Sequence, residues 1–404
     1  MNLSIPYSFQ PGLIPKLAVF PQVKDIYAKL PRDPIGGGRS SHTLRPAGFD
    51  TLVRSVKEAH RHGIGFNYLL NAAGLYGLEQ TRIGQRKVRL FIDAIAGAGV
   101  DSVTVSVPYL LRIIKKEHPE LRVKVGAFAL VDSPARAKQW EQMGADVLCI
   151  SAIACNRDFN QLARIRSSVR CELVLIANAS CMPNCAWEST HMHLLTQSSR
   201  SGDRLGGFCF DYCFLQCSSA RLRDPVSYIR SIWIRPEDLR LYEKLGYDNF
   251  KLVERSCPSE LLLRRVEAYA NGSFDGNLWE LVAPVALISK EQNAPLLQRL
   301  RMFLIFLRPD LMKLSSVFRF KRYAEAVIPR GFDRKSAPLY IDNCSLKGFL
   351  EDALRNNCRA GACDSCGVCR TWTAKAVSVN DEYVRNAGAM AASLESDLVS
   401  GSLW

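Results

Sequence analysis

Nine of the fourteen cysteines lie in two short stretches of the chain. The first stretch contains Cys181, Cys185, Cys209, Cys213 and Cys217, and the second contains Cys358, Cys363, Cys366 and Cys369. Four thiolates that converge from short spacings are the ligand set of a tetrahedral zinc ion or of an iron–sulfur cluster. Both stretches therefore predict a site for a soft metal.

The first stretch contains two cysteine pairs with the same internal spacing. Three residues separate Cys181 from Cys185, and three separate Cys213 from Cys217. Paired zinc ligands usually have two residues between them, so this spacing favours an iron–sulfur cluster. Cys209 lies four residues before Cys213 and is a further candidate metal ligand.

The second stretch reads Cys358-x₄-Cys363-x₂-Cys366-x₂-Cys369. Its last three cysteines follow the rhythm of bacterial ferredoxins, although no proline follows Cys369. Gly361 and Gly367 permit the tight turns that this spacing requires. An iron–sulfur cluster is the favoured occupant, and zinc is the alternative in this tail.

A recurring pattern of helix, glycine and short strand predicts the fold. Amphipathic segments end at Gly63, Gly99, Gly144 and Gly246, and a β-branched run follows each. A glycine after a helix adopts the left-handed conformation at little cost, and buried parallel strands read as continuous apolar runs. A strand is predicted after each of these glycines. Four further strands are predicted at Lys16–Phe20, Arg122–Ala129, Leu173–Ala177 and Ser231–Ile234, which gives eight in all.

Helical patterns lie between most of these strands. They cover Phe49–His62, Gly84–Gly97, Tyr109–Lys116, Pro134–Met143, Phe159–Ser168 and Pro258–Ala270. Eight such units predict an α/β protein with a (β/α)₈ TIM-like barrel. We expect the barrel over residues 1–275, with a Cys-rich insertion at 178–230. The barrel is followed by a helical basic segment at 276–335, in which we expect helices at Leu278–Lys290 and Ala294–Lys313. A Cys-rich appendage at 336–404 ends the prediction.

Active sites of such barrels lie at the carboxyl ends of the strands. The polar residues expected there include Asn67, Asn178, Arg235 and Arg255. The two arginines follow the last two predicted strands, where a guanidinium could bind a carboxylate or pair with a neighbouring acid. The Cys181 stretch follows the sixth predicted strand and therefore emerges on the same face. The loop at Gly36–Gly38 is either a flexible turn or a close backbone approach to a ligand.

The formal charge of +14 indicates a surface that attracts anions. Basic residues crowd one stretch: Arg301, Arg308, Lys313, Arg319, Lys321, Arg322, Arg330, Arg334 and Lys335. One interpretation is that this stretch attracts RNA or an anionic small molecule. The other is that it forms a basic face exposed to solvent. With no long apolar run and no secretory signal, we expect no transmembrane segment and a cytoplasmic location, where clustered cysteines more often bind metal.

Four segments resemble the peptidase U32 family. They are GGGRSS (Gly36–Ser41), FNYLLNA (Phe66–Ala72), NASCMPNCAWESTH (Asn178–His191) and IWIRPEDLRLYEKLGYDNFKLVERS (Ile232–Ser256). The resemblance covers residues 15–275, and the tail looks like an extension of an uncharacterised branch. It implies a barrel whose four cysteines hold a 4Fe–4S cluster, here Cys181, Cys185, Cys213 and Cys217, with Cys209 as the substitute.

The resemblance also implies a function. Well understood members of the family are oxygen-independent hydroxylases of ubiquinone precursors or RNA, with prephenate as the implied oxygen donor. We therefore expect an iron–sulfur enzyme, an oxidoreductase acting on a small molecule or RNA with a carboxylate oxygen donor. A second cluster in the tail, and a homo- or hetero-oligomer, remain open.

Two other functions are considered. One is a metal-dependent collagenase-like peptidase, although the sequence contains no Ser/His/Asp order and no His-Glu-x-x-His motif. The other is a non-catalytic RNA-binding or electron-transfer partner.

Overall fold

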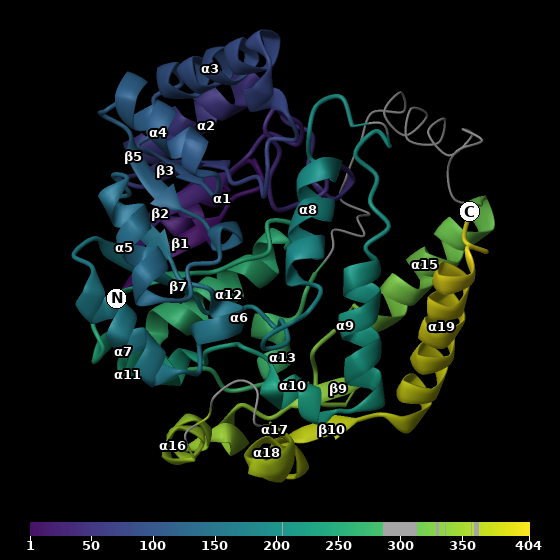
Figure 1. Ribbon diagram of the computed structural model, residues 1–404. Helices are drawn as coiled ribbons and strands as arrows, with labels where there is room; N and C mark the ends of the chain where they lie inside the picture. The colour runs from purple at the N-terminus through teal and green to yellow at the C-terminus, as the bar shows by residue number, and fades with distance from the viewer. Residues whose placement is uncertain (204, 286–312, 329–330, 336, 357, 359–362) are drawn as a thin grey trace.

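The computed structural model describes residues 1–203, 205–285, 313–328, 331–335, 337–356, 358 and 363–404 (Figure 1). Eight parallel strands form a closed barrel in sequence order. They are β1 (Asn2–Pro6), β2 (Val23–Ala28), β3 (Gly65–Leu70), β4 (Ser102–Val105), β5 (Arg122–Val125), β6 (Val147–Cys149), β7 (Glu172–Ile176) and β8 (Asn249–Lys251). Because β1 pairs with both β2 and β8, the sheet has no free edge, and the predicted (β/α)₈ barrel is confirmed.

Helices surround this sheet. Those of the barrel are α1 (Leu13–Leu17), α2 (Phe49–Arg61), α3 (Arg82–Gly97), α4 (Pro108–Glu117), α5 (Pro134–Gln142), α6 (Ala152–Cys155), α7 (Phe159–Ser168), α11 (Leu239–Glu243) and α12 (Ser259–Asn271). Short 3₁₀ turns are η1 (Ser41–Thr43), η2 (Leu78–Gln80), η3 (Ala127–Ala129), η4 (Pro236–Asp238) and η5 (Cys344–Leu346). The six predicted helices correspond to α2, α3, α4, α5, α7 and α12, with boundaries that agree within two residues.

The glycines that end the repeated helices have the predicted left-handed backbone. Their φ angles are +69° at Gly63, +81° at Gly99, +101° at Gly144 and +84° at Gly246. Each reverses the chain from a helix into the next strand, at an angle that a β-carbon would penalise.

Two predicted strands are wrong, and two real strands were missed. Lys16–Phe20 is not a strand, because α1 occupies Leu13–Leu17 and buries Leu13, Ile14 and Leu17 at helical spacing. Ser231–Ile234 is extended but outside the barrel, since β7 pairs directly with β8. The missed strands are β1 and β2, so the strand that precedes Cys181 is the seventh and not the sixth.

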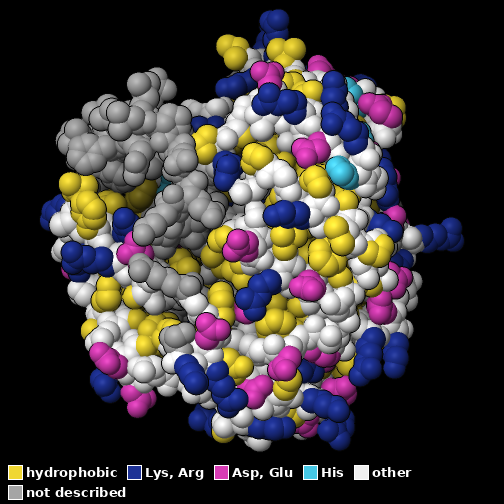
Figure 2. All heavy atoms as spheres, turned by 180° about the vertical axis from the view of Figure 1, so that it is seen from behind, with side chains coloured by type: hydrophobic (Ala, Val, Ile, Leu, Met, Phe, Trp, Pro, Cys, Tyr) yellow, Lys and Arg dark blue, Asp and Glu magenta, His cyan; other side chains and the backbone are white. Residues whose placement is uncertain are grey.

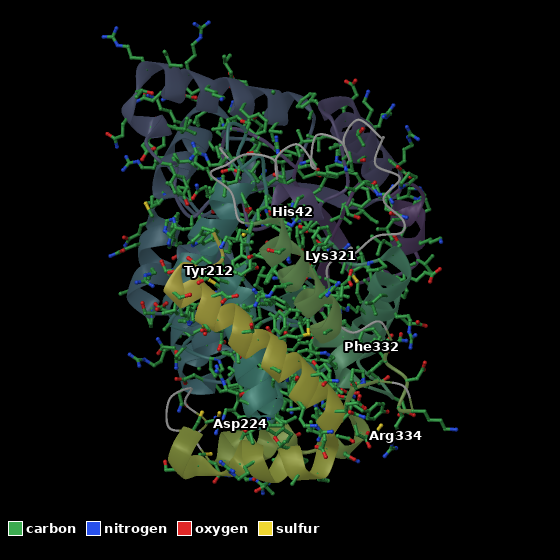
Figure 3. The ribbon with its side chains drawn as sticks, turned by 90° about the vertical axis from the view of Figure 1, so that its right-hand side faces the viewer. His42, Tyr212, Asp224, Lys321, Phe332 and Arg334 are labelled. Atoms are coloured by element: carbon green, nitrogen blue, oxygen red, sulfur yellow. The ribbon has the colours of Figure 1, made fainter. Side chains whose placement is uncertain are left out.

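A long excursion joins β7 to β8, as its length predicts. It contains α8 (Glu188–Ser198), α9 (Tyr212–Arg223) and α10 (Val226–Arg230). An apolar cluster fastens α9 to two later helices, α15 (Leu314–Val327) and α19 (Asp381–Ser400), through Leu215, Tyr323 and Ala391. Figure 3 shows α19 crossing over α9 and α15 on this side of the molecule.

The tail packs on the barrel and shares its core. It contains α13 (Leu278–Val282), β9 (Leu339–Ile341), α16 (Phe349–Arg355), α17 (Cys363–Cys366), α18 (Val368–Ala376) and β10 (Val377–Val379), and β9 pairs with β10 antiparallel. Ile341, Phe349 and Leu350 belong to the same buried apolar cluster as the barrel residues. The tail therefore packs as a continuation of the barrel, whereas the sequence predicts a separate appendage; the boundaries at 275 and 335 stay a prediction.

Part of the predicted basic helical segment lies outside the described residues. Of the helix predicted at Leu278–Lys290, the structure describes α13 and the residues up to Val285, and most of Ala294–Lys313 is not described. The same holds for Arg301, Arg308 and Arg330. Among the helices that are described, none combines the length and the apolar character needed to cross a membrane.

Arg235 attaches the tail to the barrel. Its guanidinium donates two hydrogen bonds to the Asp238 carboxylate, at 2.9 and 2.7 Å, and a third to the Asn343 carbonyl at 3.2 Å. Both side chains of the ion pair are about 95% buried, since their exposed fractions are 4% and 5%. A charge buried this deeply depends on its partner.

Arg235→Ala should therefore lower the free energy of unfolding by about 3–5 kcal/mol, because it leaves the Asp238 charge buried and unpaired. Urea denaturation followed by circular dichroism measures this change. The matched control is Arg240→Ala, a truncation at an exposed position of the adjacent helix, which should change stability by less than about 0.5 kcal/mol. Equal stabilities for the two variants would contradict the role of Arg235 as the attachment of the tail.

Candidate metal centre at the barrel mouth

The loop that carries Cys181 and Cys185 leaves the barrel at the carboxyl end of β7. The extended segment that follows α10 holds this loop, because Ile234 N–H donates to the Ala177 carbonyl at 2.8 Å and Ile232 N–H donates to that of Cys181 at 3.1 Å. The loop therefore opens at the carboxyl ends of the strands, a face that we call the barrel mouth. This is the face on which such barrels hold their active sites.

Helix α9 supplies the second cysteine pair. Asp211 caps its N-terminus by accepting a hydrogen bond from Phe214 N–H at 2.9 Å, and His191 Nε2 lies 3.0 Å from the same carboxylate. Although burial opposes its ionisation, His191 and the capping bond hold the pKa of Asp211 below its usual value. Cys213 and Cys217 are four residues apart in this helix and thus share one face.

The four thiols lie close enough to perturb one another. Cys181 is exposed by surface area, but dense protein around its sulfur, with Cys217 and Cys185 as neighbours, raises the pKa of its thiol to about 12. Burial, Asp211, Cys185 and Cys217 raise the pKa of Cys213 to about 12 as well. Each of Cys181, Cys185, Cys213 and Cys217 thus interacts with at least two of the others.

A buried arginine lies beside these thiols. Arg221 is 3% exposed, and its Nη1 lies 3.7 Å from the Cys217 sulfur, while Nη2 donates to the Ser180 carbonyl. Burial raises the pKa of Cys217, and the Arg221 guanidinium opposes that rise. Arg221 Nε is buried without a hydrogen-bond partner. A fixed cation at this position offsets the negative charge that four thiolates would carry.

Cys209 occupies a different environment. Burial, Asp211 and one thiol, that of Cys213, raise the pKa of Cys209 well above its usual value, and a hydrogen bond with Ser198 opposes that rise. Cys209 therefore lies at the margin of the thiol group, next to the α8 end and the cap of α9.

A single metal ion and a cluster require different spacings of the four sulfurs. Among the described residues, no three side chains of His, Cys, Asp or Glu are arranged to hold one metal ion. Because Zn–S bonds are about 2.3 Å long, four sulfurs around zinc lie within about 4 Å of one another. In a cubane cluster each thiolate binds a different iron atom. The sulfurs of the four cysteines are therefore farther apart than they are around zinc.

Arg255 provides an unsatisfied cation at the barrel mouth. It follows β8, is 6% exposed, and has a buried Nη1 without a hydrogen-bond partner. Burial and the neighbouring Arg39 lower its pKa to about 10, so the guanidinium remains charged at neutral pH. Arg39 itself lies 2.8 Å from Glu254, whose φ of +92° is unusual for a residue with a side chain.

The glycine loop packs over the same face. Lys29 and Asp33 form a fully buried ion pair at 2.9 Å, and Asp33 accepts a hydrogen bond from Gly36 N–H at 2.7 Å. A β-carbon at Gly37 would lie 2.6 Å from Asn71 Oδ1, so only glycine permits this approach. The loop is thus closely packed against polar groups of the barrel mouth, and the approach of its backbone to a ligand stays a prediction.

Three of the four predicted catalytic residues have structural partners. Asn67 is the third residue of β3 rather than its end, and its Nδ2 donates to Thr104 Oγ1 at 2.8 Å. It lines a cavity of about 320 Å³ that opens at the amino ends of the strands. Asn178 bonds the Val253 N–H and the Leu281 carbonyl, and Arg235 pairs with Asp238. Only Arg255 has an unpartnered nitrogen, and a catalytic role for any of the four stays a prediction.

Sequence reasoning missed Lys29, Arg39 and Arg221. Lys29 directly follows β2, a strand that was itself missed. Arg221 could have been found, because it follows Cys217 by four residues and therefore shares its helix face.

Replacing a ligand thiol should remove the metal, whereas replacing Cys209 should not. We expect Cys181→Ser and Cys217→Ser, purified without oxygen, to lose most of the barrel's iron and sulfide, because an alcohol is a poor ligand for iron. Cys209→Ser is the matched control and should retain the wild-type content. Colorimetric iron and acid-labile sulfide analysis measures both quantities. A loss in Cys209→Ser as large as in Cys217→Ser would contradict this ligand set.

Comparisons with known proteins agree with the resemblance seen in the sequence. The sequence model of Peptidase family U32 matches residues 46–269. A protein of Methanocaldococcus jannaschii named "Uncharacterized protease MJ1657" is 31% identical over 258 residues, which is 64% of this chain and 75% of that protein. The solved structure of the U32 peptidase Mk0906 has 20% identity and a TM-score of 0.47, covering 63% of this chain and 93% of that one. The chain belongs to Peptidase family U32.

Proposed function

We propose that this chain is an iron–sulfur enzyme that holds a 4Fe–4S cluster through Cys181, Cys185, Cys213 and Cys217. The observation that carries the proposal is the mutual interaction of these four thiols beside the buried guanidinium of Arg221. Thiolates are the ligands of such clusters, and hydrogen bonds to the sulfurs tune their potential. When bound, the cluster would supply one-electron chemistry next to the barrel mouth.

The residues of the barrel mouth suit a substrate or donor that carries a carboxylate. Arg255 Nη1 has no protein acceptor, and a planar carboxylate is the group that a guanidinium fork binds best. Arg39 adds positive charge nearby and is held by Glu254. The packed glycine loop limits the access of water to this face. These residues would bind and orient the carboxylate.

The proposed reaction class is oxygen-independent hydroxylation, with a small carboxylate as the oxygen donor. Its support is the resemblance to family members of this activity, together with the two features just described. The acceptor is a small molecule or an RNA.

The described part of the basic stretch favours a small molecule over RNA. Arg319 pairs with Asp397, and Lys321 lies 3.9 Å from Glu325, so neighbouring acids partly neutralise these cations. On the face seen in Figure 2, Lys and Arg side chains are interspersed with Asp and Glu. Recognition of an RNA backbone calls instead for clustered, unpaired cations.

The names of the family and of its Methanocaldococcus jannaschii member favour a second function, that of a peptidase. Ser40 Oγ lies 2.7 Å from His42 Nδ1, a contact that a hydrolytic serine would need. However, Ser40 is 3% exposed and also donates to the Gly207 carbonyl at 2.7 Å, which makes it a loop tether rather than a nucleophile. A non-catalytic RNA-binding or electron-transfer partner is the third function.

An anaerobic product assay tests the proposal. The purified protein is incubated with a reductant, prephenate as the carboxylate donor, and either small aromatic substrates or total RNA, and mass spectrometry detects products heavier by one oxygen atom. We expect such a product with the wild-type protein and none with Cys217→Ser. Casein or gelatin hydrolysis that survives Cys181→Ser would favour the peptidase instead.

Arg255→Gln should weaken binding of the carboxylate donor by about 10- to 150-fold, because a charged hydrogen bond contributes about 1.5–3 kcal/mol. Isothermal titration with prephenate measures the dissociation constant. Arg112→Gln, an exposed arginine on α4, is the control and should bind as the wild type does. Unchanged affinity in Arg255→Gln would contradict its role as the carboxylate clamp.

A further inference from the structure

The four tail cysteines also form one group of thiols. Cys358 follows α16, Cys363 and Cys366 begin and end α17, and Cys369 lies in α18. Three of these thiols, those of Cys358, Cys363 and Cys369, line one cavity. The turn at Gly367, with φ of +68°, leads from α17 into α18 and so from Cys366 to Cys369.

A buried arginine of the barrel faces this group. Arg157 is 7% exposed, and its guanidinium carbon lies 4.8 Å from the centre of the Trp233 ring and 4.9 Å from that of Phe349. Its Nη2 donates to the Ser231 carbonyl, which fixes its position. Arg157 lines the same cavity as Cys358, Cys363 and Cys369.

The tail thiols and the barrel loop border a common cavity. Its lining consists of Ala152, Ile153, Ala154, Arg157, Pro183, Arg230, Ile232, Cys358, Cys363 and Cys369. Pro183 lies between Cys181 and Cys185, and Asn184 N–H donates to the Ile153 carbonyl at 3.3 Å. The two groups of thiols are therefore neighbours across the loop that carries the first cysteine pair.

We propose that Cys358, Cys363, Cys366 and Cys369 bind a second iron–sulfur centre, held against the loop of Cys181 and Cys185 with Arg157 as its fixed counter-charge. Spacings of four and then two residues between thiolate ligands occur in plant-type ferredoxins, and two and two in bacterial ones. Arg157 and Arg230 come from the barrel, so the site is complete only when the tail is docked. The binding of this centre is independent of the proposed function, and its proximity to a first cluster rests on it.

The test uses the full chain purified without oxygen. Iron, acid-labile sulfide and zinc are counted per chain in the wild type and in two double variants, Cys363→Ser/Cys366→Ser and Cys181→Ser/Cys217→Ser. We expect each double variant to lose its own share of iron and sulfide while it retains the other share. Cys344→Ser, an exposed cysteine that contacts Asp275 at 3.2 Å, is the control and should retain both.

Three results would overturn the inference. These are a tail variant that retains all of its iron, a tail variant that loses zinc instead of iron, and a loss of iron of the same size in Cys344→Ser. The single variant Cys366→Ser separates metal loss from misfolding, because Cys366 is exposed and its replacement should leave the thermal unfolding transition intact. If Cys181→Ser/Cys217→Ser retains the wild-type iron content while Cys363→Ser/Cys366→Ser loses iron, the proposed function fails and the tail centre stands.

Electron paramagnetic resonance tests the proximity of the two centres. In the fully reduced wild type we expect the signal of the tail centre to be broadened by spin–spin interaction. That broadening should disappear in Cys181→Ser/Cys217→Ser. A tail signal of identical shape in the two proteins would contradict the placement beside the barrel loop.

Discussion

Buried positive charge beside the sulfur atoms is the interaction on which the proposed chemistry of this molecule depends. A thiolate in a desolvated environment is costly, which is why burial pushes the pKa values of Cys181 and Cys213 so high. Metal binding requires the deprotonated form. Arg221 and Arg157 each lie beside one thiol group and are fixed by a backbone carbonyl, that of Ser180 and of Ser231. The sulfur sites therefore depend on the barrel loops that hold these guanidiniums.

The barrel mouth depends on the same kind of constraint. Lys29 is compensated by Asp33, and Arg39 by Glu254, whereas Arg255 keeps an unpartnered nitrogen. A buried donor without an acceptor is destabilising unless a ligand satisfies it. The positive φ of Glu254 adds backbone strain at the adjacent residue. The free energy of folding is thus less favourable at Arg255 and Glu254 without a ligand, and a bound carboxylate would restore stability there.

The fold was predictable wherever one residue determines the local backbone. Gly63, Gly99, Gly144 and Gly246 marked the helix ends correctly because their left-handed conformation admits few alternatives. The strand β2 escaped detection because it places Asp25 in the polar interior of the barrel and so lacks a continuous apolar run. Lys16–Phe20 misled because a short apolar run does not distinguish strand from buried helix.

The proximity of the thiols in each group was predictable from the sequence, whereas their role as metal ligands stays a prediction. Short spacings brought the cysteines together, since sequence distance limits spatial distance. The pairing of Arg235 with a neighbouring acid was one of the two interpretations of the sequence, whereas its bond to the Asn343 carbonyl could not be predicted, because that residue lies far along the chain. A long-range contact of this kind leaves no local pattern. Arg157 could not be linked to the tail cysteines for the same reason.

The shared core of barrel and tail limits how this protein can be divided. The family match ends at residue 269, which invites expression of the barrel alone. Such a fragment would leave Trp233, packed 5.5 Å from Phe349 between ring centres, without its cover, and would remove the carbonyl that Arg235 bonds. Water would enter beside Arg157 as well, where two aromatic rings now flank the guanidinium. The packed core of this chain thus extends beyond the segment that defines its family.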